Sequence, residues 1–355
     1  MRWVTVQGDL LSTIAQGTAG GGPSVDYISV GTGNVWVGGV LTPRAHIIGI
    51  PLDTNTEGLF DLNIDAGTVD TPSFTVPPQR FVGGVLGPDD FVYGLPHSGG
   101  TQLLRMSTVG SLAPEVVGDA LDAGTNTTPW GAGVVAPNGD IYVLPFHGNH
   151  VLRFDPDAGT SRLVAGPFAL ASEKWFGAVL GPNGKIYGVP YAASAGVLVL
   201  DPSDDSTTIL TVTAAPGGGW QGGTLAADGH IYCTPNRGGF VLEIDPVTNS
   251  TSAFDAGTSG TNQFVSGALG ADGKIYALPS NHQPIEILVI NPVTKTTTFL
   301  AASSVMNDPW DGLVSAPDGK LYGIPKNDDR VLVIDPKANR RFPMRTLLSP
   351  FLNKY

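Results

Sequence analysis

The sequence predicts an all-β fold, a seven-bladed β-propeller with four antiparallel strands in each blade. Three observations predict it: a motif that recurs seven times, strand-like segments within each copy, and turn signals between those segments. Successive copies lie 44 to 49 residues apart, a spacing that is typical of propeller blades. The motif is an aromatic residue followed fifteen positions later by a proline: Trp36/Pro51, Phe81/Pro96, Trp130/Pro145, Trp175/Pro190, Trp220/Pro235, Phe264/Pro279 and Trp310/Pro325.

The last copy shows how each repeat forms its first hairpin. Residues 310–314 are small and apolar and predict one strand, and residues 320–325 predict the next. Between them lies Asp318-Gly319, and such a pair signals a tight turn whose two central residues take positive φ. Four other copies carry Asn-Gly or Asp-Gly here. The first two copies have Arg44-Ala45 and Asp89-Asp90 instead, so we expect irregular turns there.

Two further strands complete the blade. The third expected strand is apolar and ends at an Asp-Pro pair, as in residues 331–336, because proline has no N–H to donate to a sheet. The fourth is rich in threonine, as in residues 296–300, and threonine suits an exposed outer strand because it is β-branched yet polar. Each copy therefore predicts a four-stranded blade.

Two segments could close the ring. Residues 25–30 precede the first aromatic residue and could pair with the last blade, which would remove an exposed sheet edge. Residues 341–348 are the alternative source of the last outer strand, and we favour the N-terminal closure. The expected organisation is an N-terminal arm with a Gly-rich joint (1–24), the propeller (25–336) and a basic C-terminal tail (337–355).

The repeat resembles those of YVTN-type and NHL-type propellers. The resemblance rests on residues 317–322, where a turn precedes a Leu-Tyr strand, and on the Val-rich strand that follows and ends in aspartate. It covers roughly residues 25–336 and implies the propeller fold. Such propellers bind proteins, sugars or nucleic acids and some are enzymes, so the resemblance implies no single function.

Composition limits the partners. The net charge of −12 argues against nucleic acid and against an anionic membrane surface as the main partner. No apolar run approaches the eighteen or so residues of a membrane-spanning helix. The single cysteine, Cys233, excludes an internal disulfide, and its place after Tyr232 in an expected strand predicts that it is buried.

The two ends of the chain suggest assembly. In the arm, Leu10, Leu11 and Ile14 fit one helical face. The tail is basic and has no acidic residue, which favours docking onto an acidic neighbour or onto the ring itself; its arginines are Arg340, Arg341 and Arg345. Residues 348–355 are similar to short C-terminal peptides of some phage structural proteins. We therefore expect these segments to bind other proteins of an assembly.

Composition and the N-terminus point to a location. A charged fraction of 14% with 48 glycines is typical of exported β-proteins, yet Gly8 and Asp9 interrupt any secretion-signal core. A virion component, such as a phage tail protein, satisfies both observations because it leaves its host by lysis. A cytoplasmic protein is the alternative.

The repeated aromatic positions are expected to be mainly structural. The ring of Trp36, Phe81, Trp130, Trp175, Trp220, Phe264 and Trp310 could stack sugars, but presence in all seven copies favours packing between blades. A second repeated position, filled by tyrosine in six copies and by Ile48 in the first, is expected to pack in the same way.

The loops after the repeat prolines are the candidate recognition sites. They differ from copy to copy, and we expect them to open on the same face as the segments that precede the aromatic residues. Their polar and aromatic side chains suit ligands such as a cell-surface glycan. The candidate ligand-binding residues are His97, His147, Tyr191, Asn236, Arg237, Asn281, His282 and Lys326.

The sequence offers little for catalysis. His147 and His150 lack a third ligand at a metal-binding spacing, and the acidic pairs at 204–205 and 328–329 suit solvated turns, so neither a metal nor a cofactor is predicted. The leading hypothesis is a non-enzymatic structural and binding propeller of a larger assembly. The alternatives are a free carbohydrate-binding propeller and a metal-dependent lyase or hydrolase that would use His97, His147 or His282 in the channel.

Overall fold

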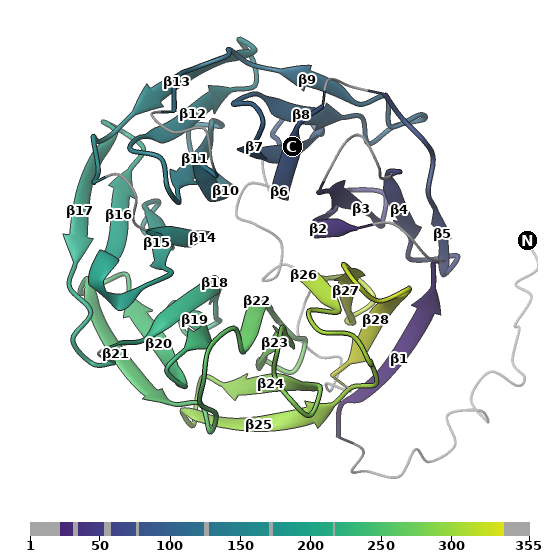
Figure 1. The fold of residues 1–355 in the computed structure, drawn as a ribbon, viewed down its shortest axis with the longest axis vertical. Helices are drawn as coiled ribbons and strands as arrows, with labels where there is room; N and C mark the ends of the chain where they lie inside the picture. The colour runs from purple at the N-terminus through teal and green to yellow at the C-terminus, as the bar shows by residue number, and fades with distance from the viewer. Residues whose placement is uncertain are drawn as a thin grey trace, which may run out of the picture.

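The computed structural model describes residues 22–30, 35–52, 58–75, 78–123, 128–169, 173–215 and 217–336. These residues form seven four-stranded antiparallel sheets arranged as blades around a central channel (Figure 1). The predicted seven-bladed β-propeller is confirmed. Helix is limited, within the described ranges, to the three-residue 3₁₀ turn η1 (Ala193–Ala195).

Each blade places its strands in order from the channel to the rim (Figure 1). The innermost strands are β2 (Trp36–Leu41), β6 (Arg80–Leu86), β10 (Trp130–Val135), β14 (Trp175–Leu180), β18 (Gly219–Leu225), β22 (Phe264–Leu269) and β26 (Trp310–Ser315). The second strands are β3 (His46–Pro51), β7 (Val92–Ser98), β11 (Ile141–Pro145), β15 (Ile186–Pro190), β19 (Ile231–Arg237), β23 (Ile275–Pro279) and β27 (Leu321–Pro325).

The outer half of each blade is made in the same way. The third strands are β4 (Phe60–Asn63), β8 (Leu103–Met106), β12 (Val151–Asp155), β16 (Val197–Asp201), β20 (Phe240–Asp245), β24 (Glu286–Asn291) and β28 (Arg330–Asp335). The outermost strands are β5 (Thr68–Asp70), β9 (Glu115–Val117), β13 (Thr160–Val164), β17 (Ser206–Leu210), β21 (Ser250–Asp255), β25 (Thr296–Ala301) and, in the last blade, β1 (Ser24–Ser29).

The N-terminal strand β1 closes the ring. It pairs antiparallel with β28, in a register that runs from Ser24 opposite Asp335 to Ser29 opposite Arg330. The ring of Tyr27 stacks on Trp310 at 6.1 Å between centroids, and the guanidinium of Arg330 lies 4.4 Å above the same tyrosine. The predicted N-terminal closure is confirmed, because β1 occupies the edge of β28 that residues 341–348 would have needed. Residues 1–21 of the arm and joint lie outside the described residues. So do residues 337–355 of the tail, which include 341–348.

The repeated aromatic and proline residues are partners across one hairpin. Trp175 lies opposite Pro190, and a bulge follows before Ala178, a pattern that recurs in every blade. Because the hairpin has a constant length, the offset of fifteen residues is constant too. The indole N–H of Trp175 donates to the carbonyl of Gly196 at 2.9 Å, just before the third strand. All seven aromatic side chains are 0–1% exposed, which leaves no face on which a sugar could stack.

Some of the repeated tyrosines tie neighbouring blades together, whereas Tyr93, Tyr276 and Tyr322 bond to an aspartate in their own blade. The Tyr187 hydroxyl donates to Asn249 Oδ1 at 3.0 Å, on the outer turn of the next blade. Tyr142 reaches Asp205 of its next blade at 2.8 Å in the same way. Burial raises the pKa of Tyr187, which keeps the hydroxyl a neutral donor. Each bridge satisfies a polar group that would otherwise be buried without a partner.

The hairpin turns differ from the expectation in one respect. In Gly181–Gly184 the N–H of Gly184 bonds to the carbonyl of Gly181 at 3.0 Å, and only Gly184 has a positive φ. This is a three-residue loop, a type I turn followed by a left-handed residue, and not a two-residue turn with two positive φ angles. Ala45 (φ 58°) and Asp90 (φ 64°) take the same left-handed place in the first two blades, with the same hydrogen bond. The prediction of irregular turns there was wrong, because one left-handed residue costs only about 1–2 kcal/mol.

Glycines let the innermost strands approach one another closely. Gly38 of β2 has φ 88° and Gly312 of β26 has φ 80°, both in the left-handed region. A Cβ added to Gly312 would lie 2.3 Å from the Cα of Gly38, and one added to Gly38 would lie 2.7 Å from the Cα of Gly83. Adjacent blades therefore meet backbone to backbone around the channel, which keeps the channel narrow.

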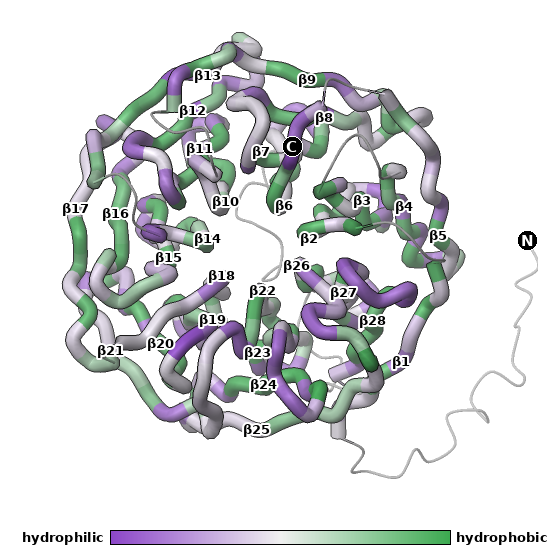
Figure 2. Tube along the Cα trace, viewed as in Figure 1, coloured by the Kyte–Doolittle hydropathy of each residue, from purple (hydrophilic) through white to green (hydrophobic). Residues whose placement is uncertain are grey.

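The core lies between blades, in clusters that each draw residues from two neighbouring sheets. Cys233 is fully buried in one of them, and burial raises the pKa of its thiol. Figure 2 shows that hydrophilic stretches gather in connections around β19, β23 and β27. In the part of the chain that the structure describes, no helix has the length and apolar character needed to cross a membrane.

Candidate functional site at the channel mouth

The loops after the repeat prolines lie on one face of the ring, here called the loop face. Each loop is bonded to the segment that leads into the innermost strand of its own blade. The N–H of Tyr191 donates to the carbonyl of Lys174 at 2.8 Å, and the N–H of Lys326 donates to the carbonyl of Pro309 at 2.9 Å. The two variable segments of a blade are therefore held side by side, beside the channel.

Two sets of positions surround the channel at this face. The channel positions follow the repeated aromatic residues and are Val37, Val82, Gly131, Phe176, Gln221, Val265 and Asp311. The rim positions follow the repeat prolines and are Leu52, His97, Phe146, Tyr191, Asn236, Ser280 and Lys326. The aromatic and proline residues hardly vary between blades, whereas the residues that follow them change from apolar to polar to charged.

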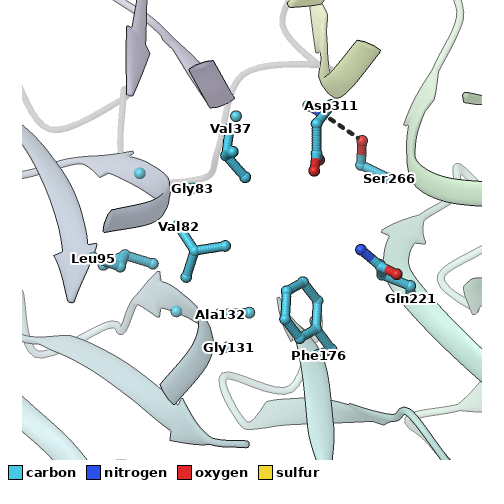
Figure 3. Close-up of a pocket in the computed structure, with 16 residues that line it drawn as sticks. Val37, Val82, Gly83, Leu95, Gly131, Ala132, Phe176, Gln221, Ser266 and Asp311 are labelled. Carbon is cyan, nitrogen blue, oxygen red and sulfur yellow. Dashed lines mark hydrogen bonds between the residues drawn. The ribbon is translucent and has the colours of Figure 1, made fainter. Parts of the chain in front are cut away.

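A pocket of about 160 Å³ opens in the channel, and six of the seven channel positions, all but Val265, line it, whereas the rim positions do not (Figure 3). Aliphatic side chains, among them Val37 and Val82, line one arc. The phenyl ring of Phe176 and the carboxylate of Asp311 point into the lumen from different sides, and Gln221 directs its amide there (Figure 3). The pocket is thus apolar on one side and polar on the other.

An aromatic corner forms where blades three and four meet. The ring of Phe146 lies 5.1 Å from that of Phe176 and 5.2 Å from that of Tyr191, in edge-to-face arrangements. Gly131 makes room for this corner, because a Cβ there would lie 3.0 Å from the Phe176 ring and 2.8 Å from the Trp175 carbonyl. Edge-to-face pairs of this kind add about 0.5–1.5 kcal/mol each beyond burial, so the corner is a fixed surface.

The basic residues beside this corner are held in place. The guanidinium of Arg237 lies 4.5 Å above the Tyr191 ring and bonds to Glu173 at 3.1 Å. His147 packs on Phe146 at 4.4 Å, with its Nδ1 2.6 Å from the Thr128 hydroxyl. These contacts orient polar groups around the aromatic surface.

His97 stands at the mouth as a neutral imidazole. Burial lowers its pKa, the Trp130 carbonyl 3.0 Å from Nδ1 opposes that effect, and the charges of Arg80 and Lys326 lower it further. Because Nδ1 donates to the carbonyl, Nε2 is left as a hydrogen-bond acceptor. Its ring centroid lies 6.4 Å from that of Phe176.

The amide side of the pocket is set by Asn236. This side chain is 1% exposed, and its Nδ2 donates to the carbonyl of Phe264 at 3.2 Å and to Gln221 Oε1 at 3.3 Å. Because the oxygen of Gln221 accepts this bond, its nitrogen is the group turned toward the lumen (Figure 3). Asn236 Oδ1 is buried without a hydrogen-bond partner in the structure.

A compact charge group lies beside the pocket and contributes Asp311 to its lining. Lys326 Nζ lies 2.5 Å from Asp308 Oδ2 and 3.4 Å from Asp311 Oδ2. Burial raises the pKa of Asp311, Lys326 opposes that rise, and Asp308 adds to it. Burial opposes the charged form of Lys326, but the carboxylates of Asp311 and Asp308 outweigh burial and raise its pKa. Lys326 therefore stays charged between two carboxylates.

The structure brings together most of the loop residues that sequence reasoning selected. His97, His147, Tyr191, Asn236, Arg237 and Lys326 lie around the channel mouth. His282 instead stacks on Phe264 at 4.8 Å and on Phe299 of the outermost strand at 5.4 Å, and Asn281 beside it is exposed. None of the eight candidate residues lines the pocket itself.

Sequence reasoning selected none of the residues that line the pocket, and Phe176, Gln221 and Asp311 are the polar or aromatic side chains that it missed at the channel positions. Each lies one position after a repeated aromatic residue that was expected to be mainly structural. The available signal was the contrast between constant aromatic residues and the variable residues that follow them.

The candidate metal ligands of the sequence have other contacts. Asp205 bonds to Arg153 at 2.9 Å and Asp328 to Arg330 at 2.8 Å. His150 Nδ1 lies 2.9 Å from Asn149 Oδ1. Among the residues that the structure describes, no three His, Cys, Asp or Glu side chains are grouped so that they could hold a metal ion.

Solved structures show what this chain is similar to. Virginiamycin B lyase from Staphylococcus aureus, in complex with quinupristin, superposes with a TM-score of 0.72 at 14% identity, over 88% of this chain and 99% of the lyase. YCF48 bound to D1 peptide superposes with a TM-score of 0.64 at 12% identity, over 88% of this chain and 94% of YCF48. The extracellular domain of a protein described as a hybrid two-component system from B. thetaiotaomicron superposes with a TM-score of 0.65 at 13% identity, over 90% of this chain and 44% of that domain's chain. At these identities the likeness shows the fold alone. Neither a protein-family model nor a curated sequence matches the chain.

Proposed function

We propose that this chain is a recognition propeller, a non-enzymatic module that binds its partner or ligand at the channel mouth on the loop face. The observation that carries the proposal is the pocket itself. Constant residues hold seven similar blades, while side chains that differ from blade to blade converge on one cavity of about 160 Å³. An asymmetric site on a symmetric scaffold is what selective recognition requires.

The geometry suits binding because its groups are fixed before any ligand arrives. Phe176 is wedged against Phe146 and Tyr191, Gln221 is oriented by Asn236, and Asp311 is held by Lys326. A preorganised site loses less conformational entropy on binding. A propeller of the same fold, YCF48, is bound to a peptide in its solved structure, which is a precedent for a protein partner.

We further propose that the propeller is carried by a larger assembly, a virion of the phage-tail kind. The support lies in the sequence: an arm (1–18) whose Leu10, Leu11 and Ile14 fit one helical face, a Gly-rich joint at 19–23, and a tail that is basic on an acidic chain. Arm and tail would dock onto other proteins of the particle. The loop face would then be displayed toward a host surface, where a protein or a glycan could be the ligand.

Sedimentation tests the assembly. In a density gradient of lysate from the native source, the chain should migrate with large particles and not at its own mass of 36.8 kDa. Deletion of residues 1–18 should leave the melting temperature nearly unchanged, because β1 begins at Ser24, but should move the chain to the top of the gradient. A full-length chain that sediments only as a monomer, or a truncated chain that is incorporated normally, would contradict the role in an assembly.

A further inference from the structure

The chemistry of the pocket narrows the class of ligand, an inference that rests on the proposed recognition at the channel mouth. One side of the pocket offers a carboxylate and an amide, and the other offers a phenyl ring and aliphatic carbon (Figure 3). A ligand that fits must therefore be polar at one end and apolar along its length.

The charge of the polar side is incompletely balanced. Lys326 lies closer to Asp308 than to Asp311, so one cation serves two carboxylates. Asp311 is 8% exposed, and its carboxylate points into the lumen (Figure 3). A buried carboxylate with only part of a counter-charge is stabilised by a second cation.

The apolar side suits a cation as well. The ring of Phe176 projects into the same lumen as Asp311 (Figure 3), and an organic cation is attracted to the face of an aromatic ring within about 6 Å. Val37 and Val82 offer aliphatic contacts beside it. An ammonium or guanidinium group on a short hydrocarbon stem would use both features.

Other cations at the mouth do not oppose such a ligand strongly. Arg237 is paired with Glu173, and His97 is neutral because burial lowers its pKa. Arg80 is exposed at the start of β6, where solvent and salt screen its charge. Among the described residues that line the pocket, Asp311 is the one with a charged side chain.

We propose that the channel pocket binds an ammonium or guanidinium group carried on an apolar stem, such as the lysine or arginine side chain of a partner. The cation lies at Asp311, and the stem lies against Phe176 and Val82. The size agrees, since a cavity of about 150 Å³ accommodates benzene and this pocket measures about 160 Å³. It admits one side chain and excludes a folded element.

The test measures ligand selectivity of the full-length protein by ligand-observed NMR. n-Butylammonium and n-butylguanidinium should bind saturably and at least tenfold more tightly than n-butanol, because charged hydrogen bonds are the stronger ones. Equal binding of the alcohol and the cations, or no binding of the cations, would overturn the proposal. This comparison needs no variant, so it does not depend on how a substitution affects folding.

Variants locate the site. Asp311→Asn keeps the shape of the side chain and should remove the preference for the cations over n-butanol. Asp329→Asn, in the same blade, changes a carboxylate that is 54% exposed and should leave the preference intact. Loss of selectivity in Asp329→Asn, or its retention in Asp311→Asn, would place the cation elsewhere and overturn the assignment.

Two more arms distinguish the sources of the cation. A blocked pentapeptide with one central lysine should bind as n-butylammonium does if a partner supplies the side chain. Replacing Arg340, Arg341 and Arg345 with alanine in the full chain should strengthen binding of the probe if the tail of this chain occupies the pocket. Binding of the lysine peptide and stronger binding of the probe by the arginine variant would each support a cation site in the pocket. If Phe176→Ala abolishes partner binding while Asp311→Asn does not, recognition at the mouth stands and the cation assignment fails.

Discussion

Replacing Gly312 with alanine is expected to lower the free energy of unfolding by roughly 2–5 kcal/mol. A left-handed backbone costs a residue with a Cβ about 1–2 kcal/mol, and a clash in a packed interior costs about 1–3 kcal/mol more. Both costs apply, because Gly312 has φ 80° and its added Cβ would lie 2.3 Å from the Cα of Gly38. Backbone cannot move aside as a flexible side chain can. Urea denaturation of the two proteins measures the difference.

Gly273 provides a matched control for that substitution. It has the same φ of 80°, but an added Cβ would meet nothing within 4 Å. Gly273→Ala should therefore cost only the backbone part, about 1–2 kcal/mol. If the two substitutions cost the same, the blades are not in backbone contact around the channel, and the account of the narrow pocket is wrong.

Replacing Lys326 with methionine is expected to cost about 3–5 kcal/mol at neutral pH, because removal of one partner leaves buried charges uncompensated. The carboxylates of Asp308 and Asp311 would lose their shared cation, since Lys326 Nζ lies 2.5 Å from Asp308 Oδ2 and 3.4 Å from Asp311 Oδ2. Lys274→Met is the control, since Lys274 is more exposed and lies 3.5 Å from Asp272, and it should cost no more than about 1 kcal/mol.

The loss of unfolding free energy caused by Lys326→Met should depend on pH. Burial already raises the pKa of Asp311, and removal of Lys326, which opposes that rise, should raise it further. A carboxyl whose pKa is higher in the folded than in the unfolded state binds more protons when folded, so folding is favoured as pH falls toward the folded pKa. The difference in unfolding free energy between Lys326→Met and the unsubstituted protein should therefore become smaller as the pH falls. Urea denaturation between pH 7 and pH 5 measures it, and a deficit that is small or constant would contradict the charge group.

Sequence reasoning predicts the ring because the repeated motif is itself a structural contact. Trp175 and Pro190 face each other across a hairpin, so a constant spacing in the sequence reports a constant geometry in the fold. The closing strand could be predicted only as the favoured of two alternatives, because β1 stands outside the repeats while residues 341–348 could also have supplied the outer strand of the last blade. The turns at Ala45 and Asp90 could not, because composition alone does not reveal that one left-handed residue is tolerated there.

The site could be predicted only in part. Position after the repeat proline places His97, Asn236 and Lys326 at the mouth, because every blade turns there in the same way. The rule does not extend to residues further along a loop, such as His282, whose ring stacks on Phe299 of the outermost strand. It also gives no hint of Asp311, which acquires its role from Lys326 in the loop after β27 and from the close approach of seven blades.

Site-directed cross-linking tests the central claim, recognition at the channel mouth. Since Cys233 is buried and burial raises the pKa of its thiol, a cysteine introduced at the surface can carry the cross-linker selectively. Ser194→Cys places it in η1 beside Tyr191 on the loop face. Val247→Cys places it on the 84% exposed turn between β20 and β21, on the opposite face.

The cross-linker is activated in native lysate, with and without Phe176→Ala in the same chain, and melting temperatures verify folding. If the channel mouth is the recognition site, position 194 gives one discrete adduct that Phe176→Ala reduces at least tenfold, and position 247 gives no adduct of that mass. Equal adducts from both faces, or an adduct at 194 that is indifferent to Phe176→Ala, would show that the channel mouth is not the recognition site.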